Sequence, residues 1–124
     1  MREQLLAWAR QGAPREVCGL LLEAEGKDGG PFDLRAVLIP NAVVGADAER
    51  RFELDPVAWV AAEQAAQSLG EVVVGMWHSH PDGPPRPSVV DAKSAEMMPS
   101  TWDYVIVDLS SAGSPGEITV WRRC

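Results

Sequence analysis

Two histidines separated by one residue have the spacing of a metal-binding pair. His78 and His80 are the two histidines of the sequence, and they end an apolar run that begins at Glu71. Side chains alternate across a β-strand, so residues at i and i+2 share a face and both imidazoles can reach one metal ion. Ser79 points to the opposite face and is expected to be structural. With the carboxylate of Asp91, the pair forms the nitrogen and oxygen ligand set that leaves a catalytic zinc ion one open position.

The same residues also have plainer interpretations. A His-x-His pair can be a hydrogen-bonded pair that binds no metal. Ser88 and Asp91 have the spacing of a helix N-terminus, where the serine oxygen accepts a hydrogen bond from a backbone N–H near the third helical position. Such a cap is compatible with metal binding, because it fixes the first helical turn and so directs the Asp91 carboxylate. The prolines between Pro81 and Pro87 restrict the connection and favour a fixed separation of strand and helix.

The elements that position these residues follow from hydrophobic patterning and from turn residues. We expect helices over 2–11, 56–68 and 88–98, and strands over 17–22, 34–40, 51–54, 71–78, 104–109 and 117–122. Asp55 followed by Pro56 predicts an N-cap and a first helical residue. The unbroken valines within 71–78 predict a central strand buried on both faces. This order of elements predicts an α+β (mixed α/β) fold in which helices cover a curved mixed β-sheet.

Composition limits the class of protein. The chain has 124 residues, the common length of one domain, so we expect 1–124 to form a single domain. Its 11 Lys and Arg against 18 Asp and Glu give a formal charge of −7, which disfavours a nucleic-acid partner. No apolar run is long enough to cross a membrane and no signal-like N-terminus is visible, so we expect a cytoplasmic protein. Cys18 and Cys124 form no disulfide framework, and the five tryptophans are expected to pack in the core.

The motif around the histidines resembles that of a known family. Residues 78–81 (His-Ser-His-Pro), with Ser88 and then Asp91 three positions later, match the signature of the JAMM (MPN+, Mov34/JAB1-type) zinc metalloproteases without any change of spacing. Residues 15–19 (Arg-Glu-Val-Cys-Gly) look like the family's first strand, in which a glutamate lies two residues before Cys-Gly. The resemblance extends, as in compact prokaryotic members, to Pro40-Asn41 and to 51–56. It implies a JAB1/MPN fold, whose architecture is related to that of cytidine deaminases.

The resemblance also implies roles for individual residues. One zinc ion per chain would be held by His78, His80 and Asp91, with a water as the fourth ligand. Glu16 would accept the proton of that water and later pass it to the leaving amine. Ser88 would donate a hydrogen bond to the oxygen that becomes negative in the tetrahedral intermediate.

The activity implied is hydrolysis of an amide bond at the C-terminal tail of a ubiquitin-like or sulfur carrier protein. An extended Gly-Gly tail could add a strand beside a sheet edge. Two leaving groups stay open: an amino acid such as cysteine at the end of a carrier, or the lysine of an isopeptide-linked conjugate. The alternative is a non-catalytic MPN-type interaction module or scaffold, which the complete motif disfavours. A cytidine deaminase would need a downstream Cys-x-x-Cys, and a serine hydrolase of the α/β type a Gly-x-Ser-x-Gly elbow; neither is present.

Overall fold

The protein has a mixed α/β fold in a computed structural model that describes residues 1–24, 34–81, 88–109 and 116–122. Its elements, in chain order, are α1 (Arg2–Gly12), β1 (Cys18–Ala24), β2 (Arg35–Ile39), the 3₁₀ helix η2 (Gly45–Glu49), α2 (Pro56–Ser68), β3 (Glu71–His80), α3 (Val89–Glu96), β4 (Asp103–Asp108) and β5 (Glu117–Arg122). The proline-rich connection between β3 and α3 and the C-terminal Cys124 lie outside the described residues.

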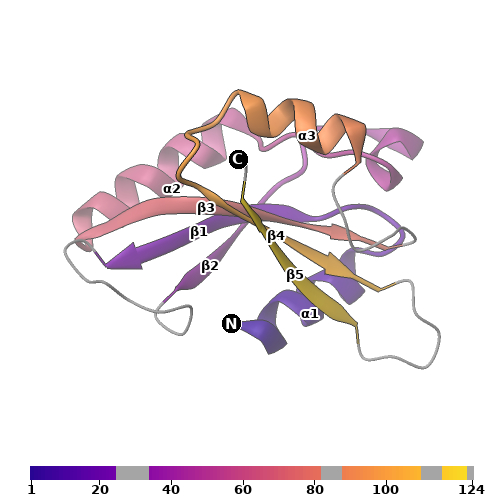
Figure 1. The fold of residues 1–124 in the computed structure, drawn as a ribbon, viewed down its shortest axis with the longest axis horizontal. Coiled ribbons are helices and arrows are strands. Elements are labelled where there is room, and N and C mark those ends of the chain that lie inside the picture. Colours follow the sequence, from indigo (N-terminus) through magenta and orange to yellow (C-terminus); the bar gives the residue numbers. More distant parts are fainter. Residues whose placement is uncertain (25–33, 82–87, 110–115, 123–124) are drawn as a thin grey trace.

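The sheet is mixed, with β3 at its centre. Its strand order is β2-β1-β3-β4-β5. β1 runs antiparallel to β2 and β3, β4 runs parallel to β3, and β5 runs antiparallel to β4. Figure 1 shows α2 and α3 on one face of the sheet and α1 on the other. The predicted mixed sheet with helices on its faces is therefore confirmed.

Each face of the sheet has its own hydrophobic core. On the α1 face, Trp77 of β3 is fully buried with Leu5 of α1, and Trp8 stacks on Trp77 with ring centroids 5.5 Å apart. On the α2 face, Met76 of β3 packs with Leu20 of β1. Because neighbouring strand residues face opposite ways, His78 and His80 lie on the same face as Met76, which is the face that α2 and α3 cover.

The start of α2 follows the predicted pattern. Asp55 is the N-cap and its Oδ2 accepts a hydrogen bond from the Ala58 N–H at 2.9 Å, while Pro56 is the first helical residue. The helix ends before Gly70, whose φ of 70° is a left-handed conformation that favours glycine. Among the described residues, no helix is both long and apolar enough to cross a membrane.

The predicted strand over 51–54 is wrong. The segment forms a single isolated bridge, between Leu54 and Asn41. Phe52 and Leu54 are buried while the residues between and before them are exposed, so the alternation in the sequence is real. Pro40 follows the last residue of β2 and has no N–H to continue a ladder. Two backbone hydrogen bonds join the segment to 40–42, from the Ala42 N–H to the Glu53 carbonyl at 2.8 Å and from the Asp55 N–H to the Pro40 carbonyl at 3.0 Å. The side chain of Asn41 takes the Arg51 carbonyl and the Glu53 N–H.

Two burial predictions also need correction. In β3, residues 75–80 are buried, but residues 71–74 are exposed or only half-buried. β4 pairs with β3 only from Gly75 onwards, so the valine-rich first part of β3 lacks a neighbour on that side. Trp121 is 38% exposed rather than in the core, because it lies on β5, which is an edge strand of the sheet. Trp77 and Trp102 are buried as expected.

Candidate metal centre

The structure brings four of the predicted site residues together at one end of β3. Glu16, His78, His80 and Asp91 each offer one ligand atom, and these atoms all lie within 4.8 Å of one another. The histidines end β3, Asp91 lies in the first turn of α3, and Glu16 lies just before β1. All four side chains are buried, with 4% to 9% exposed. Such a cluster of two imidazoles and two carboxylates has the donor set of a catalytic zinc site.

The three predicted metal ligands form a closed triangle of atoms. His78 Nε2 and His80 Nε2 are 3.0 Å apart, and Asp91 Oδ2 lies 3.1 Å from the first and 3.0 Å from the second. An imidazole nitrogen carries either one N–H or one lone pair in the ring plane, so it cannot donate to both neighbours, and one cation shared by the three atoms satisfies them all. With zinc bonds of about 2.0–2.1 Å, ligand atoms of a tetrahedron lie about 3.3 Å apart, which these residues fit closely.

A reciprocal helix cap fixes the Asp91 carboxylate. The Ser88 N–H donates to Asp91 Oδ2 at 2.9 Å, and the Asp91 N–H donates to Ser88 Oγ at 3.0 Å. The predicted capping pattern is thus present in the same residues that carry the metal-site motif. Burial alone would raise the pKa of Asp91, but hydrogen bonds with His78 and His80, and then the Ser88 N–H, hold that pKa below its usual range. Asp91 is therefore ionised, which is the form in which a carboxylate can bind a metal ion.

An aromatic ring packs on one of the two histidines. Phe52 stacks on His78, with ring centroids 4.5 Å apart and an angle of 24° between the planes. Burial lowers the pKa of His78, with the hydrogen bond to Asp91 opposing it. The lowered pKa favours the neutral imidazole, which is the form that ligates a metal. The sequence places Phe52 in the alternating segment 51–54 and in the family resemblance, but it does not predict the contact with His78.

Glu16 is a buried carboxyl group with an unsatisfied oxygen. Within the described part of the chain, Glu16 Oε1 has no hydrogen-bond partner, and a buried polar atom without a partner costs about 1–3 kcal/mol. Burial raises the pKa of Glu16 to about 8, with the charge of His80 lowering it and that of Asp91 raising it. A carboxyl group of this kind suits proton transfer near neutral pH. The orphaned oxygen also fits a site built to receive an ion and its water.

The backbone around Glu16 is held by side chains and by a neighbouring loop. The Glu16 N–H donates to the Ala48 carbonyl at 2.7 Å, and Asn41 Nδ2 donates to the Glu16 carbonyl at 3.0 Å. Ser79 Oγ accepts from the Val17 N–H at 2.8 Å, and the Ser79 N–H donates to the Val17 carbonyl at 2.9 Å. Ser79 is therefore structural, as expected, and it ties the segment that carries Glu16 to β3.

The buried thiol beside the site is not a reactive group. Cys18 is fully buried, and its Sγ lies 3.4 Å from the Ile39 carbonyl, to which it donates. Burial, followed by the charge of Glu16, raises the pKa of Cys18 to about 12. A thiol with so high a pKa forms little thiolate near neutral pH. The side chain acts as a small buried hydrophobe, as the sequence predicts.

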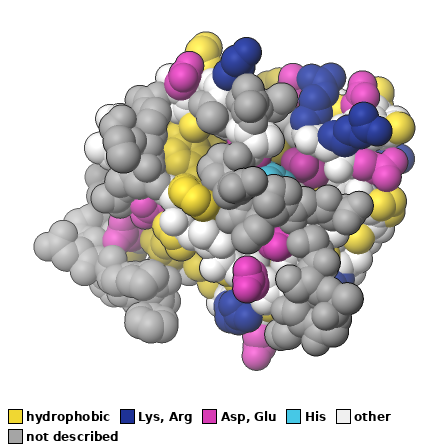
Figure 2. Space-filling view, turned by 45° about the vertical axis from the view of Figure 1, so that its right-hand side comes forward, with side chains coloured by type: hydrophobic (Ala, Val, Ile, Leu, Met, Phe, Trp, Pro, Cys, Tyr) yellow, Lys and Arg dark blue, Asp and Glu magenta, His cyan; other side chains and the backbone are white. Residues whose placement is uncertain are grey.

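A small part of a histidine side chain is visible at the surface, in cyan, next to acidic side chains (Figure 2).

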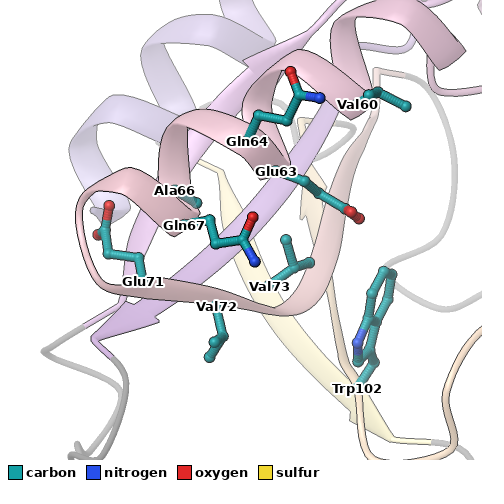
Figure 3. Close-up of a pocket in the computed structure, with 9 residues that line it drawn as sticks. All are labelled: Val60, Glu63, Gln64, Ala66, Gln67, Glu71, Val72, Val73 and Trp102. Atoms are coloured by element: carbon teal, nitrogen blue, oxygen red, sulfur yellow. The ribbon is translucent and has the colours of Figure 1, made fainter.

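A hollow of about 470 Å³ lies elsewhere, between α2, the start of β3 and Trp102 (Figure 3). Its two carboxylates are engaged, because Glu63 accepts from Trp59 Nε1 at 2.6 Å and Glu71 pairs with Arg35. It contains none of the four clustered residues.

Comparisons with known proteins show the family to which the chain belongs. A family model described as prokaryotic homologs of the JAB domain matches residues 1–124. A desampylase of Haloferax volcanii is 39% identical over 100 residues, which are 76% of this chain and 67% of that protein. A desampylase of Pyrococcus furiosus is 32% identical over 106 residues, 86% of this chain and 65% of that protein. The chain thus spans about two-thirds of the length of these relatives.

The fold is also that of a solved structure. A JAB1/MPN domain protein from Archaeoglobus fulgidus superposes with a TM-score of 0.57, covering 97% of this chain and 82% of that chain at 21% sequence identity. At this identity the likeness shows the fold alone. The predicted JAB1/MPN architecture is therefore confirmed.

Proposed function

This chain belongs to the family of prokaryotic homologues of the JAB domain, as a JAMM-type hydrolase, and on that premise we propose that it is a zinc-dependent protease of ubiquitin-like protein tails. The observation that carries the proposal is the triangle of His78, His80 and Asp91, with Glu16 within 4.8 Å of it. We assign one zinc ion per chain to the three triangle atoms. A zinc ion bound there would lower the pKa of a coordinated water and polarise the carbonyl of the scissile bond.

Glu16 is assigned as the general base and acid. Its Oε1 has no partner among the described residues, so this oxygen is available to take a proton from the attacking water. The raised pKa of Glu16, about 8, lets the same group hold the proton and return it to the leaving amine. Proton transfer of this kind contributes about 10²–10⁴-fold to the rate.

Ser88 is assigned to the developing negative charge on the substrate oxygen. Its Oγ already accepts from the Asp91 N–H, which leaves the hydroxyl proton for an outside acceptor. The residue is exposed, at the N-terminus of α3. A hydrogen bond donated from this position stabilises an oxyanion more than the neutral carbonyl that precedes it.

The substrate assigned is a ubiquitin-like protein joined through its C-terminal Gly-Gly tail to an amine. Two relatives of this chain are desampylases, which supports a ubiquitin-like partner. An extended tail would add to an edge of the sheet by main-chain hydrogen bonds, and the two glycines would let the chain approach the buried cluster closely. The lysine of a conjugate and the C-terminal amino acid of a sulfur carrier are the two leaving groups to compare.

Products identified by mass spectrometry test the proposal. The zinc-loaded protein is incubated with a ubiquitin-like protein that is either linked to a lysine side chain or extended by a C-terminal cysteine, and Glu16→Gln serves as the inactive control. We expect cleavage after the second glycine, lost in the control and in the protein stripped of metal. Cleavage by Glu16→Gln at the wild-type rate, or by metal-free protein, would refute the mechanism.

A further inference from the structure

We propose that Asn41 is a positioning residue that holds the base Glu16 and the aromatic ring of Phe52 in one fixed arrangement around the metal centre. The inference rests on the proposed function, since it concerns the same base and the same ligand set. Asn41 lies just after β2, outside the cluster, and touches none of the ligand atoms in its recorded hydrogen bonds. Its effect on the reaction is therefore exerted through other residues.

The carboxamide of Asn41 uses all of its hydrogen-bonding capacity. Its Nδ2 donates to the Glu16 carbonyl at 3.0 Å and to the Arg51 carbonyl at 3.2 Å. Its Oδ1 accepts from the Val43 N–H at 3.0 Å and from the Glu53 N–H at 3.1 Å. A primary amide has two N–H donors and one oxygen with two lone pairs, so each of the four is used. Asp at this position would lose both donors, and Ala would lose all four bonds.

These four bonds join the two sides of the site. The Arg51 and Glu53 bonds bracket Phe52, whose ring stacks on the ligand His78 at 4.5 Å. The remaining donor holds the carbonyl of Glu16. The side chain of Asn41 thus sets where the backbone of Glu16 lies relative to the ring of Phe52. Outer groups that orient a metal-bound histidine commonly change metal affinity or activity 10–100-fold when mutated.

Glu16 depends on this support because it lies outside the strand ladder. β1 begins at Cys18, two residues later, so its register with β3 does not extend to Glu16. The Glu16 N–H donates to the Ala48 carbonyl in η2, and the Glu16 carbonyl accepts from Asn41. Both backbone groups of the base are therefore held by the connection between β2 and α2. A displacement of about 1 Å at a reacting group can lower a rate about 10²-fold.

The test compares Asn41→Ala and Asn41→Asp with a control that loses a hydrogen bond without disturbing the site. Asp55→Ala is the matched control, because it removes only the bond from the side chain to the Ala58 N–H, at the far end of the same connection. Asn41→Asp keeps an oxygen for the Val43 and Glu53 N–H groups and loses the donors to the Glu16 and Arg51 carbonyls. It is the second variant if Asn41→Ala does not fold. All variants are measured in zinc-loaded form, at a temperature where circular dichroism shows them folded.

We expect both Asn41 variants to lower kcat about 10-fold or more with KM near the wild-type value, while Asp55→Ala stays close to wild type. If Asn41 only stabilises the fold, the loss of kcat should be proportional to the fall in Tm in Asn41→Ala, Asn41→Asp and Asp55→Ala alike. The second readout is the dissociation constant for zinc, from competition with a chromophoric chelator. Asn41→Ala and Phe52→Leu are expected to weaken zinc binding about 10-fold, and the double variant to lose less than the sum, because both act through the Phe52 contact.

The inference is overturned if Asn41→Ala matches Asp55→Ala in both kcat and zinc affinity, or if Asn41→Asp keeps the wild-type kcat. Failure of the proposed function looks different. A wild-type protein that cleaves neither substrate removes the hydrolase mechanism, while the zinc constants of Asn41→Ala, Phe52→Leu and their double variant still decide the role of Asn41. An active wild type with an equally active Asn41→Ala removes the Asn41 role alone.

Discussion

Replacing Glu16 by Gln should lower activity and raise stability at the same time. Glu16 is 4% exposed and its Oε1 has no partner among the described residues. The substitution keeps the shape of the side chain and removes its ability to take a proton, so kcat should fall about 10²–10⁴-fold. It also replaces a buried carboxyl group, whose pKa burial raises from 4.5 to about 8, by an amide that cannot ionise. At pH 7.5 the wild-type carboxyl is charged in the unfolded chain and must take up a proton or bury its charge on folding, which costs the metal-free protein about 1–3 kcal/mol. Glu16→Gln without metal should therefore be more stable than wild type.

The size of the shift is measurable. For a chain of this length, 1 kcal/mol corresponds to about 4 °C in Tm, so metal-free Glu16→Gln should melt about 4–12 °C above metal-free wild type at pH 7.5. Urea unfolding of the two proteins gives the free-energy difference directly. Zinc content should be unchanged, since the three triangle atoms are untouched. Gains in stability with loss of activity are typical of residues kept for function.

The control is the same chemical change at a paired carboxylate. Glu71 bonds Arg35 at 2.6 Å and 3.1 Å, so Glu71→Gln removes an attraction and should leave stability equal or slightly lower. If Glu16→Gln raises stability and Glu71→Gln does not, the burial of Glu16 without a partner decides the change in stability, rather than the replacement of a carboxyl group by an amide. The reasoning is refuted if metal-free Glu16→Gln is no more stable than wild type, or if the zinc-loaded variant keeps most of its kcat.

Three further predictions concern the proposed metal ligands, the packing at Gly19 and the pair of Arg35 with Glu71. His78→Ala, His80→Ala and Asp91→Ala should each lose most bound zinc, because each removes one of three protein ligands; metal analysis with Gln64→Ala as a surface control checks this, and full zinc in all three contradicts it. Gly19→Ala should lower stability by about 1–3 kcal/mol, since a Cβ there would meet the Val37 carbonyl and the Trp77 indole; an unchanged Tm would argue against that packing. Glu71→Gln should cost under about 1 kcal/mol. Arg35 lowers the pKa of Glu71 below its usual 4.5 in the folded protein, so the stability difference from wild type should be present at neutral pH and be lost as the pH falls through this lowered pKa. Urea unfolding curves at several pH values measure the difference.

Local patterns were sufficient for the elements and for part of the site. Asp55 and Pro56 mark the start of α2 by side-chain chemistry alone, and the reciprocal bonds of Ser88 and Asp91 follow from a spacing of three. The two histidines share a face because a strand alternates. In each case the information lies within a few residues, so the sequence alone predicts it.

Other features depend on pairing that no local pattern contains. The distance from Glu16 to the histidines follows from the register of Cys18 with His78, and family resemblance rather than periodicity indicated it. The alternation of 51–54 predicted a strand, but the backbone of 40–42 and the side chain of Asn41 decide how that segment is bonded. Burial along β3 depends on where β4 begins to pair. The family resemblance includes Asn41, but no local pattern predicts that its side chain bonds both the Glu16 carbonyl and the backbone around Phe52.

The position of the candidate metal centre follows from the opposite directions of the two strands that flank β3. β4 runs parallel to β3, so the chain must cross back over the sheet between them, and α3 in that crossover begins beside the carboxyl end of β3. Asp91, in the first turn of α3, is thereby returned to the two histidines. β1 runs antiparallel to β3, so its start lies at the same end, and Glu16, two residues before it, reaches the cluster from the other side. The connection to the parallel neighbour therefore carries the third proposed ligand, and the segment before the antiparallel neighbour carries the proposed base.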